Sequence, residues 1–216
     1  MINLIAYGGC GAAAYLAGSI PFGFLIGRAR GIDVRTVGSG NIGATNVFRT
    51  VGKPWGLLAF LLDALKGLAG AWLIPLALQG KTGAFHLEAA QVLGGCLAVV
   101  GHNWPITMRF KGGKGVATSA GVLLGWSPPA IAVGLAVWII VLVSTRYVSV
   151  ASLSAAVLIP VWVWATRGAD NVLIPVALTV LGLLVIARHR TNLRRLWMGT
   201  ENRFEFRHGA KRNRPS

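Results

Sequence analysis

Residues 114–145 read "KGVATSAGVLLGWSPPAIAVGLAVWIIVLVST", an apolar stretch with two consecutive prolines near its middle. One helix over the whole stretch would exceed the roughly 17–25 residues that usually cross a bilayer. Pro128 and Pro129 lack backbone N–H donors, and a proline disfavours helical geometry in the residue before it, so we expect a turn over 126–129. The stretch therefore predicts two helices, over 114–126 and 128–145.

The composition of the whole chain indicates a membrane protein. Hydrophobic residues make up 54% of its 216 residues and charged residues only 12%, about half of the charged fraction of an average soluble domain. Several apolar runs reach the length of about 18 residues that is typical of a spanning helix. We expect an all-α integral membrane protein with seven transmembrane helices, over 3–27, 54–79, 86–106, 114–126, 128–145, 147–166 and 170–188. These helices form one domain, residues 1–203, followed by a basic, flexible cytoplasmic tail, residues 204–216.

The distribution of charge gives the expected orientation. The net charge is +15, and basic residues gather in segments 28–53 and 107–114, at Arg146 and in the tail from Arg188 onward. The positive-inside rule places these segments on the cytoplasmic side and the N-terminus outside. A single helix over 114–145 would move the basic tail outside, so the charges also favour seven helices. Basic segments between and after apolar runs fit an anionic membrane face, and we expect no nucleic-acid partner.

Three polar stretches fall on this expected cytoplasmic side. They are "VGSGNIGATNVFR" (37–49), "GHNWPITMRFKGGKGVATS" (101–119) and "RHRTNLRRLWMGTEN" (188–202). The first contains GxGxxG, but no strand or βαβ unit surrounds it, so a dinucleotide site is not indicated. Cys10 and Cys96 lie in apolar segments and show no zinc spacing. We therefore expect neither a cofactor nor a metal.

The three stretches combine glycines with hydrogen-bond donors, as phosphate sites do. Backbone N–H groups of glycine-rich loops can converge on an anion, an arginine fork suits phosphate oxygens, and a helix N-terminus favours an anion. Three separate stretches suggest more than one phosphate, or one phosphate that moves during a reaction. The candidate phosphate-binding residues are Gly38, Ser39, Gly40, Asn41, Gly43, Thr45, Asn46, Arg49, His102, Lys111, Gly112, Gly113, Lys114, Gly115, Arg188, His189, Arg190 and Asn192.

Plainer interpretations stay open for some of these residues. Glycines near membrane helices often serve packing or turns, a histidine can be structural, and arginines of the tail can anchor the inner face. Asp63 and Lys66 are three residues apart in an apolar helix, so they can pair on one face. Charges inside a membrane are functional candidates, and a structural ion pair facing the bundle is at least an equal alternative.

At these motifs the sequence resembles the bacterial acyl-phosphate-dependent glycerol-3-phosphate acyltransferases, which are small integral membrane enzymes of phospholipid synthesis. Segments "GSGNIGATN" (38–46), "GHNWP" with "FKGGKGVAT" (101–118) and "RHRTNLRRLWMGTENRF" (188–204) match the three cytoplasmic motifs of that family. Segments "LDALKG" (62–67) and "RYVSVASL" (146–153) match as well. The resemblance implies a seven-helix bundle in the bacterial plasma (inner) membrane, with its active site on the cytoplasmic side.

The resemblance also implies a reaction. Members of this family transfer a fatty acyl group from acyl phosphate to glycerol 3-phosphate, which gives lysophosphatidic acid and inorganic phosphate. The candidate catalytic residues carried over by motif are Lys114, Ser39, Arg49, His189 and Asn192. Further candidates are Ser149, Asp63, Lys66 and Glu201. The expected partners are the two substrates, the bilayer and the soluble enzyme that supplies acyl phosphate.

A transporter or channel for a phosphorylated anion is the alternative function. It would explain the basic loops equally well. Against it, the polar residues lie on one face and not at the midplane of the membrane, and we see no inverted repeat. Formation of lysophosphatidic acid by purified protein in detergent would separate the two functions.

Overall fold

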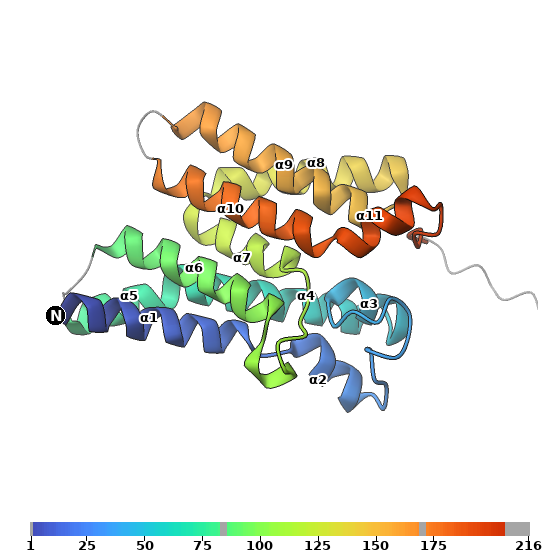
Figure 1. Cartoon of the computed structure of the whole chain (residues 1–216), viewed down its shortest axis with the longest axis horizontal. Coiled ribbons are helices and arrows are strands. Elements are labelled where there is room, and N and C mark those ends of the chain that lie inside the picture. Colours follow the sequence, from blue (N-terminus) through green and yellow to red (C-terminus); the bar gives the residue numbers. More distant parts are fainter. Residues whose placement is uncertain (1, 83–85, 169–171, 206–216) are drawn as a thin grey trace, which may run out of the picture.

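The computed structural model describes residues 2–82, 86–168 and 172–205, and the regular structure within these residues is entirely helical. Figure 1 shows most of the helices running along one common direction. In chain order they are α1 (Ile2–Gly18), α2 (Phe22–Ala29), α3 (Ala44–Thr50), α4 (Lys53–Leu68), the π-helical turn η1 (Ala69–Leu73), α5 (Ile74–Thr82), α6 (Leu87–Asn103), the 3-10 turn η2 (Ile106–Met108), α7 (Val116–Trp126), α8 (Pro128–Thr145), α9 (Val148–Arg167), α10 (Leu173–Arg188) and α11 (Arg190–Trp197). The all-α prediction is confirmed for the described residues.

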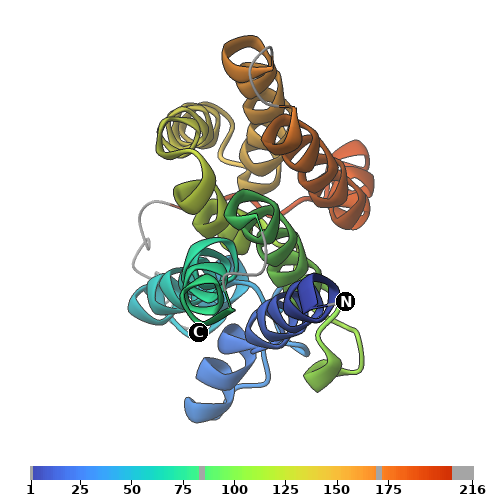
Figure 2. The same ribbon diagram turned by 90° about the vertical axis from the view of Figure 1, so that its left-hand side faces the viewer.

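The helices form two groups that meet at α6 and α7. In the end-on view of Figure 2, α1, α4 and α5 lie on one side of this pair, and α8, α9 and α10 lie on the other. Contacts between α1 and α6, between α4 and α7, between α7 and α8 and between α10 and α6 connect the groups. The two polar segments 37–49 and 188–202 therefore come from opposite groups.

Several helices are long and apolar enough to cross a membrane. The candidate spans are Leu4–Ala29, which contains α1 and α2, Lys53–Gln79, which contains α4, η1 and part of α5, Pro128–Thr145 and Val148–Arg167. The bent pair of α10 and α11 adds a fifth span if it is counted as one. Helix α7 has only 11 residues, about 16 Å at 1.5 Å per residue and roughly half the thickness of a bilayer core. The described helices fit a multi-pass membrane protein, while seven crossings and an outward N-terminus stay predictions.

The predicted turn in the middle of 114–145 is confirmed. Helix α7 ends at Trp126 and α8 begins at Pro128, which is its first residue. Proline fits this position because the first N–H groups of a helix have no intrahelical partner. Ser127 between the two helices is fully buried, and Trp126 Nε1 donates a 3.2 Å hydrogen bond to the Gln91 carbonyl of α6. The turn thus lies inside the protein, against α6.

The predicted helix 3–27 is wrong in its middle, because it is broken between α1 and α2. Pro21 cannot donate to the ladder and its ring clashes with the preceding turn, so the helix stops at Gly18. The carbonyls freed by the break accept bonds from other elements. Lys66 Nζ donates to the Ile20 carbonyl at 2.7 Å, and Thr107 Oγ1 donates to the Ser19 carbonyl at 2.7 Å. The break therefore becomes a point where α4 and η2 attach.

Two short helices, α3 and α11, were not predicted. They have 7 and 8 residues and lie within the polar stretches. In α11 the apolar residues Leu193, Leu196 and Trp197 do recur at helical spacing, but the surrounding charges concealed this short pattern. Helix α11 continues from α10 after a bend of 53°. The predicted helix 54–79 is helical throughout, although η1 interrupts its α-helical ladder.

Close packing of α4 on α7 places the segment before α7 beside α4. A Cβ at Gly67 would lie 2.0 Å from the Thr118 carbonyl oxygen, and a Cβ at Gly121 would lie 1.8 Å from that of Ala64. No larger residue fits at either position, because the backbones of α4 and α7 lie so close together that a Cβ would overlap the facing carbonyl oxygen.

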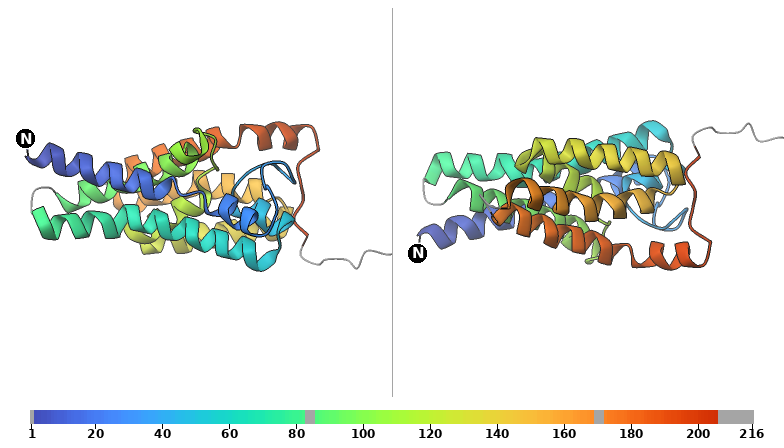
Figure 3. Two further views of the ribbon diagram at one scale, coloured as in Figure 1. Left: turned by 90° about the horizontal axis from the view of Figure 1, so that it is seen from below. Right: turned by 90° about the horizontal axis from the view of Figure 1, so that it is seen from above.

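The three polar stretches gather at one end of the bundle. Both views in Figure 3 place α3, the loop before it, α11 and residues 198–205 at the end opposite the N-terminus. Lys114 of the second stretch bonds to Asn192 of α11. Of the predicted tail 204–216, residues 206–216 lie outside the described residues.

Candidate active site

A cavity of about 610 Å³ opens between α4, α7, α8 and α9, next to the gathered loops. Its walls along these helices are mostly apolar and include Phe60, Leu61, Leu65, Leu68, Leu123, Leu124, Ile131, Leu135, Trp138 and Ile159. Most of its polar lining comes from loops, helix ends and the short helices α3 and α11: Ser39, Asn41, Thr45, Asn46, Arg49, His102, Lys114, Ser149, His189, Asn192, Arg195 and Glu201. We call this part of the cavity the polar end. Asp63, Ser119 and Ser152 line the cavity from within α4, α7 and α9. One cavity thus joins a charged site to an apolar channel.

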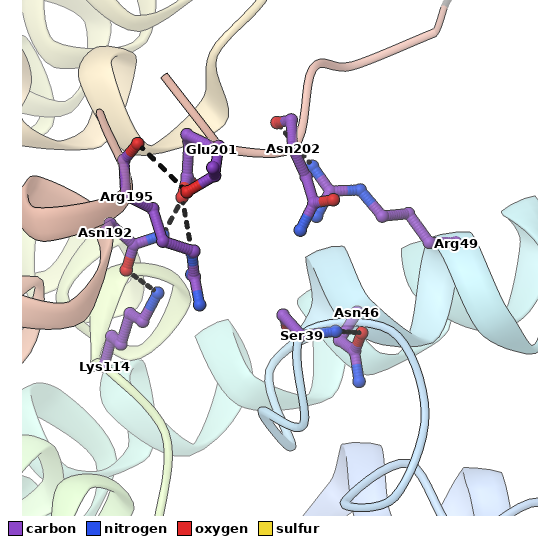
Figure 4. A network of polar contacts seen from close by, with 9 residues as sticks. Ser39, Asn46, Arg49, Lys114, Asn192, Arg195, Glu201 and Asn202 are labelled. Carbon is purple, nitrogen blue, oxygen red and sulfur yellow. Dashed lines mark hydrogen bonds and ion pairs between the residues drawn. The ribbon is translucent and has the colours of Figure 1, made fainter. Parts of the chain in front are cut away.

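All five candidate catalytic residues lie at the polar end. Ser39 and Arg49 come from the loop before α3 and from α3 itself, Lys114 from the loop before α7, and His189 and Asn192 from the junction of α10 and α11. Figure 4 shows Lys114, Arg49 and Ser39 around a common open space. Of the further candidates, Ser149, Asp63 and Glu201 also line the cavity.

Lys114 is held from the side of α11. Its Nζ donates a hydrogen bond to Asn192 Oδ1. Burial lowers the pKa of the Lys114 ammonium to about 8; the negative charge of Glu201 opposes this shift, and the positive charges of Arg195 and Arg49 add to it. Lys114 is therefore a cation whose proton is held less tightly than that of a free lysine.

Glu201 organises the cations of the polar end. Asn192 Nδ2 donates to Glu201 Oε1 at 2.6 Å, and Arg195 Nε donates to Glu201 Oε2 at 2.8 Å. Burial alone would raise the pKa of Glu201, but these hydrogen bonds hold it below its ordinary value. The carboxylate stays ionised at neutral pH and fixes Asn192, the partner of Lys114.

Asn46 shapes the first glycine loop. Its Oδ1 accepts from the Ser39 N–H at 2.9 Å, and its Nδ2 donates to the carbonyls of Val34 at 2.8 Å and Val37 at 3.2 Å. Gly38 has a φ of +61°, and a Cβ there would lie 2.3 Å from Asn46 Oδ1. This position therefore needs glycine.

The second glycine loop uses its backbone donors internally. The N–H of Gly112 bonds to the Asn103 carbonyl at 3.2 Å, and that of Gly113 bonds to the His102 carbonyl at 3.0 Å. Arg188 in turn donates to the carbonyls of both glycines. In the first loop the N–H of Gly43 likewise bonds to Asn41 Oδ1 at 2.8 Å. The N–H groups of these three glycines are thus bonded within the protein, and the glycines shape the loops that carry the polar side chains.

The predicted pairing of Asp63 with Lys66 is confirmed. Lys66 Nζ lies 2.8 Å from Asp63 Oδ1, and both side chains are almost fully buried. His102 joins them, with its Nδ1 3.5 Å from the same oxygen. A Cβ at Gly113 would lie 2.0 Å from His102 Nε2, so the histidine ring packs directly against the loop that carries Lys114.

His189 has a fixed orientation. It is buried, and its Nδ1 lies 2.8 Å from the Val185 carbonyl oxygen. A carbonyl accepts, so Nδ1 carries the hydrogen and Nε2 is the atom left for a substrate.

The structure divides the remaining candidates. Asn41 borders both the cavity and a second pocket of about 290 Å³, which Gly40, Lys111, Gly112 and Arg188 also line. Gly43, Thr45, Asn46, His102 and Gly115 line the main cavity. Arg190 is exposed, and Gly38, Gly113, Arg190 and Lys66 line neither space.

A family model described as glycerol-3-phosphate acyltransferase matches residues 9–199. The chain belongs to the glycerol-3-phosphate acyltransferase family. The resemblance inferred from the motifs is therefore confirmed.

Individual members of the glycerol-3-phosphate acyltransferase family match over nearly their whole length. The protein of that name from Geobacter sulfurreducens is 46% identical over 194 residues, 90% of this chain and 95% of the relative. That from Geotalea daltonii is 45% identical over 195 residues, 89% of this chain and 94% of the relative.

Two crystal structures of PlsY, an integral membrane glycerol 3-phosphate acyltransferase, have the same fold. The glycerol 3-phosphate form has a TM-score of 0.82 at 39% identity and covers 92% of this chain and 96% of its own. The lysophosphatidic acid form has a TM-score of 0.80 at 38% identity, with 92% and 95% covered.

Arg195, a charged residue of the cavity, was not among the candidates from the sequence, and neither were Ser119 and Ser152. Arg195 lines the polar end and binds Glu201. A signal for it was present, because Asn192 and Arg195 are three residues apart and such residues share one face of a helix. No helix was predicted over 190–197, so the three-residue spacing of Asn192 and Arg195 was not interpreted.

Proposed function

We propose that this protein transfers a fatty acyl group from acyl phosphate to glycerol 3-phosphate and releases lysophosphatidic acid and inorganic phosphate. The observation that carries the proposal is the single cavity in which Lys114, Arg49, Ser39, His189 and Asn192 surround the polar end of an apolar channel. Such a site suits two substrates with phosphate groups, one of which also bears a hydrocarbon chain.

The cations of the polar end bind the two phosphates. Arg49 offers a planar fork that matches phosphate oxygens, and Lys114 offers a point charge. Phosphates repel one another in water, and these cations let them lie side by side. Holding the acceptor hydroxyl beside the acyl carbonyl supplies the entropic part of the rate acceleration.

The chemical step is an acyl transfer. The glycerol 3-phosphate hydroxyl oxygen attacks the carbonyl carbon of the acyl phosphate, a new ester C–O bond forms, and the bond from that carbon to the phosphate oxygen breaks. The hydroxyl proton leaves with the phosphate. Lys114 stabilises the negative charge that grows on the departing phosphate. Ser39, Asn192 and His189 Nε2 orient the acceptor by hydrogen bonds.

The apolar walls hold the acyl chain. Residues of α4, α7, α8 and α9 line the channel beyond the polar end, and buried CH₂ groups contribute about 0.8 kcal/mol each. The chain enters from the bilayer, in which these helices lie.

The charges and the family support a setting for this protein in the cell. We propose seven crossings, an outward N-terminus and a cytoplasmic polar end in the bacterial inner membrane, because the basic segments lie at that end. A soluble enzyme that makes acyl phosphate would supply the donor from the cytoplasm.

Purified protein in detergent tests the reaction. Incubation with palmitoyl phosphate and glycerol 3-phosphate should yield lysophosphatidic acid and phosphate in equal amounts, measured by mass spectrometry and a phosphate assay. Transport of a phosphorylated anion needs a membrane with two sides, so a transporter would form no product here. If the folded protein forms no lysophosphatidic acid from these substrates, the proposal is refuted.

A further inference from the structure

The chain beyond α11 crosses the polar end of the cavity as an extended segment. We call residues 199–204 the strap. Glu201 of the strap lines the cavity, and the Asn202 carbonyl accepts a 3.3 Å hydrogen bond from Arg49 of α3. Figure 4 shows the strap passing Arg49 on one side and Arg195 on the other. The strap therefore touches side chains from two separate polar stretches.

The far end of the strap is fixed to the junction of α8 and α9. The Phe204 N–H donates to the Arg146 carbonyl at 2.7 Å. Arg203 Nε donates to the Tyr147 hydroxyl at 3.0 Å, and its guanidinium carbon lies 5.4 Å from the centre of the same ring. These contacts hold the strap where it leaves the cavity.

Phe204 also binds α3. Its ring centre lies 5.4 Å from that of Phe48, with 37° between the ring planes, a distance at which aromatic pairs attract. Phe48 directly precedes Arg49 in the sequence. The ring pair and the Arg49–Asn202 bond are thus two neighbouring contacts between one helix and one strap. Both contacts therefore join α3 to the strap at the residue that points its guanidinium toward the cavity.

We propose that Phe204 is a positioning residue for Arg49: it clamps the strap against Phe48 so that the guanidinium faces the phosphate of glycerol 3-phosphate. The inference rests on the proposed function, since it assigns Arg49 to that substrate. Phe204 itself does not line the cavity, so it acts through Phe48 and Asn202.

Kinetics of purified variants test this role. Phe204→Ala should raise the KM for glycerol 3-phosphate about tenfold, because small misplacements of a binding group cost rate and affinity. The KM for palmitoyl phosphate should stay within about twofold of the wild-type value, since Glu201, the strap residue linked to Lys114, is held by Asn192 and Arg195 of α11 and not by Phe204. Phe204→Tyr keeps the ring and should behave as wild type. A chain ending at Glu205 is the matched control and should also behave as wild type.

A double-variant cycle separates positioning from general destabilisation. Arg49→Lys loses the fork, so Phe204→Ala should add little to it if Phe204 acts through Arg49. Additive losses, equal effects on both KM values, or a loss in the shortened chain as large as that of Phe204→Ala would overturn the proposal. Should Phe204→Ala not purify as a folded protein, Phe204→Leu takes its place under the same criteria.

Calorimetry keeps this inference separate from the reaction. Binding of glycerol 3-phosphate alone needs no acyl donor, so it can be measured even if no acyl transfer occurs. Weaker binding in Phe204→Ala and normal binding in Phe204→Tyr support the positioning role. Normal binding in both variants contradicts it, whatever the outcome of the acyl-transfer assay.

Discussion

Lys114 and Asn192 are 78 residues apart in the chain, yet Lys114 Nζ donates a hydrogen bond to Asn192 Oδ1. Asn192 in turn donates to Glu201 at 2.6 Å. This chain of contacts joins the glycine loop before α7 to α11 and to the strap. It holds the ammonium at the polar end of the cavity, where a substrate phosphate can replace or join its amide partner.

The first prediction concerns the charge of Lys114. Replacement by Ala should lower kcat about 100-fold or more, because a preorganised cation at the leaving phosphate is removed. Lys114 makes its side-chain bond at the cavity and not in the apolar core, so the thermal midpoint should change little. Lys53→Ala is a matched control, since Lys53 is exposed at the start of α4. Near-normal turnover of Lys114→Ala would contradict the assignment.

The pH profile gives a second prediction. The pKa of Lys114 is lowered to about 8, so the ammonium is present below that pH and is lost as the pH rises through it. We expect kcat/KM to fall on the alkaline side with a midpoint near this value, because kcat/KM reports the free enzyme. The corresponding fall in kcat should occur at a higher pH, since a bound phosphate favours the charged form of Lys114.

Lys114→Arg provides the check on this assignment. A guanidinium keeps its charge far above neutral pH. The residual activity of this variant should therefore no longer fall at alkaline pH. If the wild type and Lys114→Arg show the same fall in activity at alkaline pH, a group other than Lys114 causes it.

The cysteine-labelling prediction concerns orientation. Single cysteines at Thr36 and Gly209 should resist an impermeant thiol reagent in intact cells and react after permeabilisation, because the basic segments are expected inside. The native Cys10 and Cys96 are replaced first so that they do not contribute. Glu88 lies in the first turn of α6, at the other end of that helix from His102 and the second polar stretch. A cysteine at Glu88 should therefore react in intact cells. The reverse pattern would rule out the proposed orientation.

The sequence predicted well what depends on local composition. The double proline located the α7–α8 turn, and the spacing of Asp63 and Lys66 located their ion pair, because both effects act within a few residues. The break at Pro21 also had a local cause, but the apolar run around it hid the signal. Helices α3 and α11 are short and lie in polar stretches. The Asn46 and Asn192 side chains tie them to Val34 and Glu201, and in α11 the apolar spacing of Leu193, Leu196 and Trp197 was a sequence signal that was not used.

What could not be predicted depends on the meeting of distant segments. The sequence contains no histidine with a following aspartate at the spacing used by many acyltransferases, yet His102 of α6 comes to 3.5 Å from Asp63 of α4. The glycine loops were expected to offer free N–H groups, but those of Gly112 and Gly113 bond to the end of α6. Such pairings are set by helix packing, which single-segment patterns do not contain.

The last prediction concerns the acyl donor. Thioester-dependent acyl transfer commonly relies on a histidine that deprotonates the acceptor. His102 Nδ1 faces Asp63, as in a histidine base, but the ring is buried and its Nε2 packs against the Gly113 backbone, which leaves no room there for an acceptor hydroxyl. An acyl phosphate is a mixed anhydride with a good leaving group, so it makes less demand on a base. Its phosphate also suits the cations beside Lys114, whereas a thioester has no phosphate next to the reacting carbonyl.

We therefore expect turnover with palmitoyl phosphate, little or none with palmitoyl-CoA or acyl carrier protein, and no loss of activity in EDTA. Lysophosphatidic acid formation, measured with each donor at equal concentration, is the readout. Equal rates with palmitoyl-CoA and palmitoyl phosphate, or complete inactivation by EDTA, would contradict the mechanism itself.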